Sequence, residues 1–560
     1  MSLRPIPRLL LGAALLAAPS LGAQDGAPAP DPAAADSAAA PPAAQASLVE
    51  VRALSVVGGA DEEAARVAQL RGAAPATGYL LRSPSSRTPG SGGRPRVSLL
   101  APEVLLAWNS RSPFSLNDGR LWAGRGAGVL ASAGVAVEAG PVRLVLAPEL
   151  AYSANAAFDT LVPLAWRQAD PATYYPDWQR GEHSIDLPYR MGGDAVSEIG
   201  PGQSSLTLRL GAVEAGAGTE NEWWGPGIRN ALVLSNQGPG FGHLFARTAR
   251  PLRTPLGRVE ARWISGALRD SRWYARERGD DGERGWRSLS AAALVLSPGR
   301  GLSVGLARSV MAPADGAGDA LAGGAGVLTR WKEERDPLDP DRYEQITSLF
   351  ARLVMPEEGA EVYLEWARTR LPLNLRDLLE APEHSQGYTL GLQWLRPAGD
   401  GDIRIQAETT YLEEDPSFAW RSTGSWYASA TIQQGYTHEG QVVGASVGPG
   451  ASQQWLAVDW LRGTGRAGLF VSRVRWVDDA YYDKPGGPNL YFGHDVSIFG
   501  GARGALGIGG IRLDAEYALE RRWNVFFQNT SIDFNNRESV NAMNHTLRLR
   551  FSAAAPRLGR

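Results

Sequence analysis

The chain has 560 residues, no cysteine, 66 glycines, 18 tryptophans and a formal net charge of −3. This charge offers no basic surface for nucleic acid, which excludes nucleic acid as a partner. Without cysteine there are no disulfides, so stability has to come from a large core or from complete strand pairing.

The first 23 residues have the pattern of a secretory signal peptide. Arg4 and Arg8 form a charged region, Leu9 to Ala18 is apolar, and Leu21-Gly22-Ala23 is a cleavage site before Gln24. The apolar run is too short to span a bilayer as a helix. Removal of the two arginines changes the net charge from −3 to −5. No later apolar stretch is long enough to predict a transmembrane helix.

Two further segments precede the main body of the chain. Residues 24–47 are rich in Ala and Pro and predict a disordered spacer. Residues 48–95 are interpreted as a periplasmic N-terminal segment. Within it, residues 60–71 predict a short helix, because acids occupy the first turn and Gly72 follows the end.

From about residue 96 the sequence alternates between apolar and polar residues. In residues 403–409 the apolar set alternates with Arg404, Gln406 and Glu408, and residues 511–520 repeat this pattern. Such alternation predicts β-strands with one apolar and one polar face. A soluble sandwich or propeller also has two-faced strands, but they are shorter. The long strands, the signal peptide and the lack of cysteine favour an all-β, transmembrane antiparallel β-barrel over residues 96–552, with a C-terminal tail at 553–560.

The alternation locates sixteen strands. They are expected near 96–108, 128–138, 141–154, 204–214, 256–269, 287–297, 301–311, 346–355, 359–370, 386–396, 401–412, 453–461, 464–477, 493–505, 507–519 and 543–552. Short links alternate with long loops such as 155–203, 312–345 and 520–542, which is typical of outer-membrane barrels. The last strand ends in a phenylalanine, Phe551, and strands that the barrel-assembly machinery recognises commonly end in this residue type.

Two oversized segments interrupt this alternation. Residues 215–255 fall where a short periplasmic turn is expected, and residues 413–452 lie on the other side. Both are rich in Gly and aromatic residues and contain Gly-Pro-Gly. Each is expected either to hide one more strand or to fold inward as a plug, since polar backbone is tolerated inside a barrel. We hypothesise that at least one of them narrows the lumen.

The first of these segments contains Trp223-Trp224-Gly225-Pro226-Gly227. Neighbouring tryptophans in extended chain point to opposite sides, and Gly-Pro-Gly fixes a rigid bend. Packing is the simpler prediction for both indoles, with glycan stacking as the alternative. Strand parity predicts a position on the periplasmic side or inside the barrel, away from the outer loops.

Several stretches, in this order, resemble the Wzi-type family of outer-membrane capsule-assembly proteins over roughly residues 96–552. They are Asn117-Asp118-Gly119, Leu121–Gly126, Leu146–Ser153, Glu222–Gly227 leading to Leu234-Ser235-Asn236, and Gly435–Gly440 leading to Gly444 and Gly448-Pro449. The motif residues expected to be structural or luminal are Asn117, Asp118, Trp122, Arg125, Glu222, Trp223, Trp224, Gly225, Pro226, Gly227, Asn236, Tyr436, His438 and Gly440. For Arg125, a turn position is the simpler alternative.

The resemblance implies an eighteen-stranded barrel that acts as a lectin and holds capsular polysaccharide or exopolysaccharide at the cell surface. The expected barrel therefore has 16–18 strands, with the two oversized segments as the places for the missing pair. The resemblance also implies a small helical N-terminal element at the periplasmic face, for which residues 60–71 are the candidate. Outer-membrane lipid and the barrel-assembly machinery are the other expected partners.

Aromatic and polar residues in two loops have the composition of a sugar-binding site. The candidates are Trp166, Tyr174, Tyr175, Trp178, Tyr481, Tyr482 and Tyr491. Flat aromatic faces suit the C–H patches of sugars, and functional residues of barrels are concentrated in loops. The alternative is an aromatic girdle at the membrane interface, which is the expectation for the strand residues Trp263, Trp366 and Trp394.

The sequence gives little support for catalysis. Six histidines are present, and only His438-Glu439 suggests acid–base chemistry. No spacing predicts a metal site or a cofactor. The leading interpretation is a non-enzymatic polysaccharide-binding barrel in the bacterial outer membrane. An oligosaccharide-conducting porin and an outer-membrane hydrolase remain the alternatives.

Overall fold

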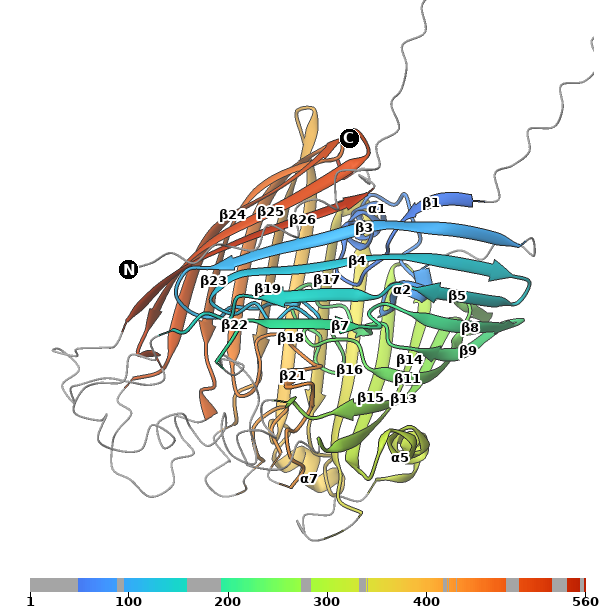
Figure 1. The fold of residues 1–560 in the computed structure, drawn as a ribbon. Coiled ribbons are helices and arrows are strands. Elements are labelled where there is room, and N and C mark those ends of the chain that lie inside the picture. The colour runs from blue at the N-terminus through green and yellow to red at the C-terminus, as the bar shows by residue number, and fades with distance from the viewer. Residues whose placement is uncertain are drawn as a thin grey trace, which may run out of the picture. The chain divides into compact units, whose positions relative to one another are not determined.

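The computed structural model describes residues 49–87, 95–158, 193–272, 284–331, 339, 341–415, 421, 423–429, 431–479, 493–525, 541–553 and 558–559. The chain divides into two units, of which the first, Met1–Ser47, lies outside the described residues and the second is Leu48–Arg560. The second unit consists mainly of long antiparallel strands (Figure 1). The expected signal peptide and spacer lie outside the described residues.

The long strands form one continuous wall. In chain order they are β3 (Arg96–Asn109), β4 (Gly126–Ala139), β5 (Val142–Leu146), β6 (Glu149–Ser153), β7 (Val196–Gly200), β8 (Ser205–Leu210), β9 (Val213–Gly218), β11 (Gly242–Thr248), β12 (Leu252–Thr254), β13 (Gly257–Arg269), β14 (Trp286–Gly299), β15 (Leu302–Ala314), β16 (Glu344–Met355), β17 (Ala360–Arg368), β18 (Gln386–Ala398), β19 (Gly401–Tyr411), β22 (Ser452–Arg462), β23 (Gly465–Arg475), β24 (Val496–Ile508), β25 (Ile511–Trp523) and β26 (Ala542–Ala553).

The remaining elements are short. They are β1 (Val49–Ala53), α1 (Ala60–Leu70), β2 (Leu81–Arg82), α2 (Pro84–Arg87), β10 (Trp223–Trp224), α5 (Ala317–Ala322), η3 (Gly323–Ala325), α6 (Gly326–Thr329), η4 (Pro356–Glu358), α7 (Leu375–Glu380), β20 (Thr437–His438) and β21 (Gln441–Val442). No helix among the described residues is long and apolar enough to span a membrane.

The wall is a closed barrel of eighteen antiparallel strands. The sheet has 22 strands, of which β1 is a parallel addition to β3. Three pairs, β5/β6, β7/β8 and β11/β12, are each one wall strand with a break. Pro148, which lacks an N–H, lies in the first break. β9 pairs with β11 and β26 pairs with β3, so the wall has no free edge.

The sequence predicted sixteen of these strands, and the missing pair is β9 and β11. These strands have only six and seven residues, so their alternation is weak. Both lie at the margins of the segment 215–255. The prediction of a hidden wall strand in residues 413–452 is wrong for the described part of this segment. That part contains only the two-residue strands β20 and β21, which pair with each other.

The two extra strands also correct the placement of the first segment. The turn between β8 and β9 is the short one, and the connection 219–241 leaves from the same end of the barrel as the long loops. The segment with Trp223-Trp224 therefore leaves the wall at the opposite end from the one expected, and the contacts described below place both residues in the lumen, one of the two positions expected. The connections 219–241 and 412–451 enter the lumen from the same end.

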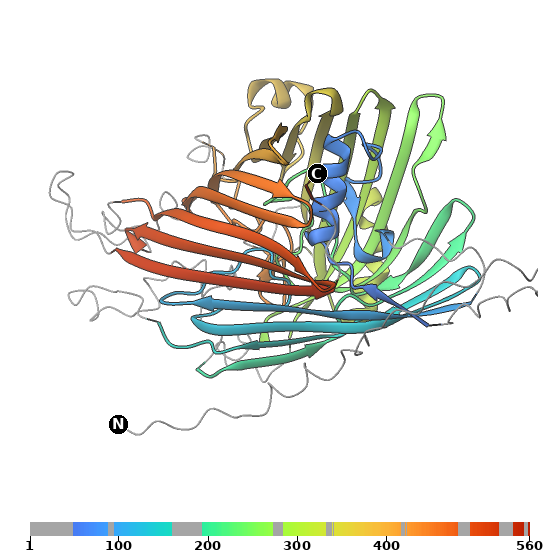
Figure 2. The ribbon, with the colours of Figure 1, turned by 90° about the horizontal axis from the view of Figure 1, so that it is seen from above.

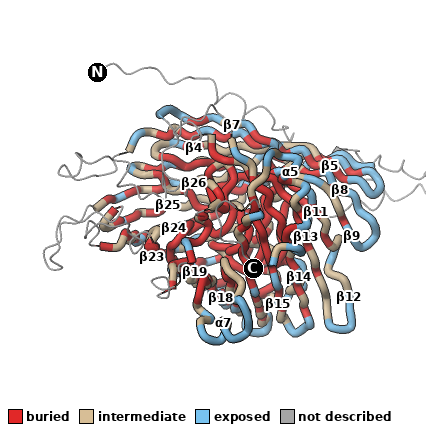
Figure 3. Tube along the Cα trace, turned by 90° about the horizontal axis from the view of Figure 1, so that it is seen from below, coloured by how far each residue is buried: buried red, intermediate tan, exposed pale blue. Residues whose placement is uncertain are grey.

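The two faces of the wall differ as the alternation predicted. In β19, Arg404 and Glu408 are buried toward the lumen, whereas Ile403 is 42% exposed on the outside. In β25, Arg512 is fully buried and Ile511 is 56% exposed. Figure 3 shows this mixture of buried and exposed positions along the strands. A polar interior and an apolar exterior are the arrangement that a barrel needs in lipid.

The exterior of β13 and β14 carries polar residues that the loop 317–329 covers. Trp263 Nε1 and Ser290 Oγ donate hydrogen bonds to the carbonyl oxygen of Gly324 at 3.0 and 2.6 Å, and Ser265 Oγ donates one to Leu321 O at 2.6 Å. This loop therefore satisfies wall residues that would otherwise face outward without partners. Trp263 therefore faces outward and is also held by its hydrogen bond to this loop.

The predicted helix is present as α1 and lies inside the ring of strands (Figure 2). Asp61, Glu62 and Glu63 occupy its first turn, and Gly72 follows its end with a φ of 70°. Val67 and Leu70 pack against Val354, Leu395 and Leu461 of the wall. The helix is therefore a luminal element at the end of the barrel that carries the short turns.

Candidate functional site: the luminal plug and its charged chamber

The segment 219–241 crosses the lumen and is anchored by the two tryptophans. β10, which is Trp223–Trp224, pairs with Leu81–Arg82 in antiparallel register. As predicted for extended chain, the two indoles have different surroundings. Trp224 is fully buried in the main luminal core, whereas Trp223 packs with Val57 and Ala231. The contacts of Trp224 are thus those of a packed side chain.

The Gly-Pro-Gly bend is required by close approaches. Gly225 has a φ of 114°, and a Cβ atom there would lie 2.8 Å from a carboxylate oxygen of Glu365. A Cβ atom at Gly227 would lie 1.8 Å from the carbonyl oxygen of Asn230. Only glycine fits at both positions, so the bend brings the backbone against the wall.

A wall carboxylate holds the residues after this bend. The backbone N–H groups of Ile228, Arg229 and Asn230 donate to Glu408 at 2.6, 3.0 and 2.9 Å. The hydroxyl of Tyr363 donates to the same carboxylate at 2.7 Å. Charge-assisted bonds of this kind are stronger than neutral ones, so Glu408 fixes the path of the segment across the lumen.

Glu222, the acid of the motif, ties the start of the segment to β13. Its carboxylate accepts hydrogen bonds from Arg262 and, at 3.0 Å, from Trp224 Nε1. The neighbouring Glu220 accepts from the backbone N–H of Ser85 at 2.8 Å. These contacts join the N-terminal segment, the plug and the wall.

The second luminal segment packs directly on the first. Tyr436 donates its hydroxyl hydrogen bond to Val233 O at 3.0 Å, and the Ser235 N–H donates to Val443 O at 2.9 Å. Tyr427 and Tyr436 stack with ring centroids 5.8 Å apart. Both segments belong to the same buried apolar cluster as the wall residues Phe245 and Ile264. Together, residues 219–241 and the described residues of 423–451 form what we call the plug, which fills this level of the lumen.

His438 has a structural position in the plug. Its Nδ1 accepts a hydrogen bond from the backbone N–H of Arg269 at 3.1 Å, and burial lowers the pKa of His438 to about 4. The neutral ring therefore fastens β20 to the end of β13. Glu439, with a φ of 50°, and Gly440, with a φ of 86°, form the turn that follows.

The earlier motif also reaches the plug. The N–H of Asn117 donates to Gln237 at 2.6 Å, and its side-chain amide donates to Arg229 O at 2.8 Å. Asn236 donates to the carbonyl oxygens of Val57 and Asn117 at 3.0 and 3.3 Å. Asp118 forms an ion pair with Arg548 of β26. The structure therefore brings Asn117, Asp118 and Asn236 together.

Two motif residues lie away from this cluster. Trp122 is buried and lines a separate small void of about 20 Å³. Arg125 donates to backbone carbonyl oxygens of Ser110 and Ala157. Arg125 thus has the turn position, which was the simpler of its two predicted roles.

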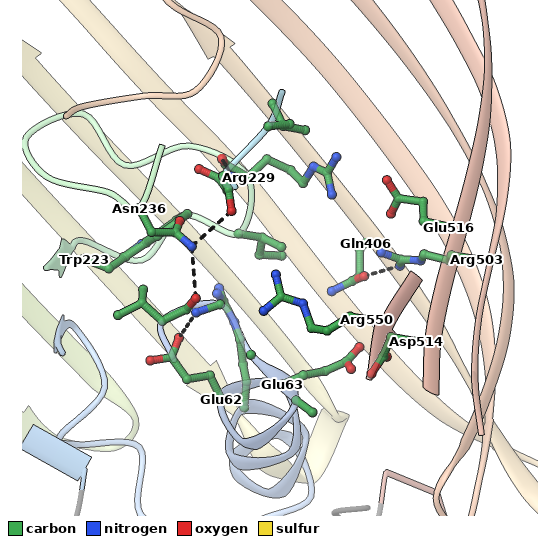
Figure 4. A pocket seen from close by; sticks show the side chains of 18 of the residues that line it. Glu62, Glu63, Trp223, Arg229, Asn236, Gln406, Arg503, Asp514, Glu516 and Arg550 are labelled. Atoms are coloured by element: carbon green, nitrogen blue, oxygen red, sulfur yellow. Dashed lines mark hydrogen bonds between the residues drawn. The ribbon is translucent and has the colours of Figure 1, made fainter. Parts of the chain in front are cut away.

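Between the plug, α1 and the wall lies a chamber of about 250 Å³. Figure 4 shows α1 with Glu62 and Glu63 on one side, Trp223, Arg229 and Asn236 of the plug on another, and Gln406, Arg503, Asp514 and Glu516 of the wall opposite. Charged and amide side chains dominate its lining, and Trp223 and Tyr79 contribute rings.

Three arginines of the wall form ion pairs with α1 beside this chamber. Glu63 pairs with Arg404 at 2.7 Å, with Arg466 at 2.5 Å and with Arg512 at 3.4 Å. Burial alone would raise the pKa of Glu63, but the arginines outweigh it and hold this pKa well below its ordinary value. Arg66 of the helix pairs with Glu361 of β17 at 2.5 Å.

These wall arginines and acids were not predicted from the sequence as site residues. In the sequence, the charged second face of the strands indicated that these side chains face the lumen. It did not indicate which of them lie in contact with one another. Among the described residues, no group of three His, Asp or Glu side chains is arranged to hold a metal ion. The seven loop aromatics proposed for sugar contact lie at 166–178 and 481–491, outside the described residues.

The fold and the filled, charged lumen define a plugged eighteen-stranded β-barrel with an apolar outer belt. Residues 125–544, three quarters of the chain, match the family model of capsule assembly protein Wzi. The chain belongs to this family.

The chain is similar to the following solved structures. The Escherichia coli protein Wzi aligns with a TM-score of 0.50 and 10% identity over 80% of this chain and 84% of that one. That protein is described as an outer-membrane protein involved in group 1 capsule assembly and as a carbohydrate-binding β-barrel. OccAB2 of Acinetobacter baumannii aligns with a TM-score of 0.38 and 10% identity over 83% and 99% of the two chains. OccK5 of Pseudomonas aeruginosa gives a TM-score of 0.37 and 8% identity over 83% and 99%. No curated protein sequence matches the chain.

Proposed function

We propose that this protein is a non-enzymatic outer-membrane barrel that binds capsular polysaccharide or exopolysaccharide and anchors it at the cell surface. The observation that carries the proposal is the plug. Two segments from one end of the barrel interlock in the lumen through buried tyrosines and a shared apolar core. Packing of this kind suits a binding platform better than a passage for oligosaccharides.

The outer wall supports a position in the membrane. Trp394 and Trp460 are exposed near the short turns, with Arg396 and Arg462 at 5.0 and 5.9 Å from their rings. Tyr388 and Tyr411 stack on the wall near the long loops. Aromatic girdles at both ends of an apolar belt are typical of outer-membrane barrels.

The lengths of the turns and loops give the orientation of the barrel in the membrane. Short turns of such barrels face the periplasm and long loops face outward. We therefore place α1 at the periplasmic end of the lumen and the loops with Trp166, Tyr174, Tyr175, Trp178, Tyr481, Tyr482 and Tyr491 at the cell surface, where polysaccharide is met.

Binding of the producing cell's purified polysaccharide to the detergent-solubilised full chain tests this proposal. Replacement of Tyr481 and Tyr482 by Ala is expected to weaken binding, since both belong to the loop aromatics that the sequence predicts for sugar contact. Trp394→Ala is the matched control, because it removes an aromatic side chain at the opposite end of the wall. If the wild-type protein does not bind the polysaccharide, the proposal fails.

The alternatives give different results in two further assays. A porin would show open-channel currents in a planar bilayer, and the packed plug predicts that the wild-type protein does not. A hydrolase would shorten the glycan and lose this activity in His438→Ala. The hydrogen bond from Arg269 to His438 predicts that this variant instead loosens the plug.

A further inference from the structure

The chamber beside α1 contains more polar groups than its own contacts satisfy. Among the described residues, no hydrogen-bond partner exists for Trp223 Nε1, Glu62 Oε1, or Nε and Nη2 of Arg82. All three residues line the chamber, and each is at least 95% buried. Buried polar groups normally have partners, so these atoms indicate that something else occupies the space.

The remaining contacts of these residues hold the free atoms in place. Arg82 Nη1 donates to Glu62 Oε2 at 2.8 Å, which leaves Glu62 Oε1 free. The Arg82 guanidinium lies 4.6 Å from the ring centroid of Tyr79 and 5.1 Å from that of Trp223. The three side chains are therefore rigid neighbours, and a ligand would meet them without reorganising them.

Three more unpartnered atoms face the same space from the plug and the adjoining loop. They are Asn117 Oδ1, Asn236 Oδ1 and Arg229 Nε. The free set consequently contains donors, on Trp223, Arg82 and Arg229, and acceptors, on Glu62, Asn117 and Asn236. A simple anion would satisfy only the donors, and a cation only the acceptors.

We propose that this chamber is a second binding site, which takes one neutral sugar unit through its hydroxyl groups. A hydroxyl both donates and accepts, so adjacent hydroxyls on a ring match the mixed set of free atoms. The volume of about 250 Å³ is just below the range of pockets that hold drug-sized molecules. It suits one ring or a chain end rather than a polymer passing through.

This site is distinct from the proposed contact of polysaccharide with the outer loops. It lies on the α1 side of the plug, and its argument rests on the unpartnered atoms of the lumen. The two proposals can therefore fail independently. Loss of surface polysaccharide binding in the loop variants would leave the chamber intact, and loss of the chamber would leave the loops intact.

Saturation-transfer NMR of the solubilised full chain with D-glucose, D-galactose or D-mannose tests the chamber. We expect at least one hexose to bind, and Trp223→Phe to weaken it roughly fivefold, because the variant keeps the packing but removes one hydrogen-bond donor. Glu62→Gln removes an acceptor and is expected to weaken binding similarly. Trp122→Phe is the matched control: its Nε1 is also buried and unpartnered, but it lines a different void.

A crystal of the wild-type protein soaked in the binding hexose provides the second readout. Density for a ring next to Trp223 supports the site. The proposal is overturned if no hexose binds, if Trp223→Phe binds as the wild type or Trp122→Phe loses as much, or if the chamber of the soaked crystal holds only ordered water.

Discussion

The hydroxyl of Tyr427 donates a hydrogen bond to the carbonyl oxygen of Leu232 at 2.9 Å. The hydroxyl oxygen of Tyr427 in turn accepts a hydrogen bond from the backbone N–H of Ala445 at 2.8 Å. One buried side chain thus joins two luminal segments that are about 200 residues apart in the sequence. The plug is therefore a cooperative structure, in which each segment supplies the partners for the other.

Tyr427→Phe tests this cooperation. The change keeps the ring but leaves Leu232 O and Ala445 N without their partner, which is expected to cost about 1–3 kcal/mol. Urea unfolding in detergent, followed by tryptophan fluorescence, measures the loss. Tyr388→Phe, on the wall, serves as control and is expected to change the free energy of unfolding by less than about 0.5 kcal/mol. Equal losses in both variants would contradict the role of Tyr427.

Trp224→Ala separates a packing role from a ligand-binding role. Trp224 is fully buried, so its truncation is expected to lower the free energy of unfolding by about 3–5 kcal/mol. Ion currents in a planar bilayer should appear as the plug loosens, with polysaccharide binding reduced only as a consequence. Trp394→Ala on the outer wall is expected to leave the barrel closed. A Trp224→Ala protein that is stable and closed but binds no polysaccharide would make Trp224 a ligand residue instead.

Because Glu63 forms ion pairs with wall arginines, we expect the docking of α1 to depend on pH. Its pKa in the folded protein lies well below the ordinary value of 4.5. The free energy that this carboxylate contributes to the docking of α1 is therefore fully present above about pH 4.5. It is lost as the pH falls toward the pKa of Glu63 in the folded protein. Hydrogen exchange of residues 60–70 between pH 7 and pH 3 measures it, and exchange should become faster, relative to the intrinsic rate, at the acid end.

Glu63→Gln removes the same contribution at every pH. Arg404, Arg466 and Arg512 each lose one partner but keep Asp459 or Asp514, so we expect a loss of roughly 1–3 kcal/mol in helix docking at pH 7. The exposed pair of Glu358 and Arg396 provides the control, because Glu358→Gln should change little. If Glu63→Gln keeps the wild-type pH dependence, another group controls the docking.

Much of the barrel was predictable from local patterns. The alternation around Arg404 and Ile403, or Arg512 and Ile511, identified both the strands and the side of each that meets the lumen. Helix 60–71 was identified by its acidic first turn and by Gly72. These signals are local, because a strand or helix expresses its two faces within a few residues.

The plug depends on contacts that no local pattern encodes. β9 and β11 were missed because Gly216, Gly218 and Gly242 weaken their alternation. Their omission reversed the strand parity, so the Trp223 segment was expected to leave the wall at the end that carries the short turns. Likewise, nothing near Glu408 in the sequence indicates that its partners are the amides of residues 228–230. Such pairs follow from the closed barrel, which fixes which strand faces which segment.

Retention of capsule by the producing cell tests the central claim most directly. Cells that lack this protein are compared with cells that carry the wild-type gene or the Tyr481→Ala, Tyr482→Ala variant, and polysaccharide is measured on the cells and in the medium. The proposed function predicts that deletion releases polysaccharide into the medium, that the wild-type gene restores retention, and that the variant restores it incompletely. If cells without the protein keep their polysaccharide on the surface as the wild type does, the anchoring function is contradicted.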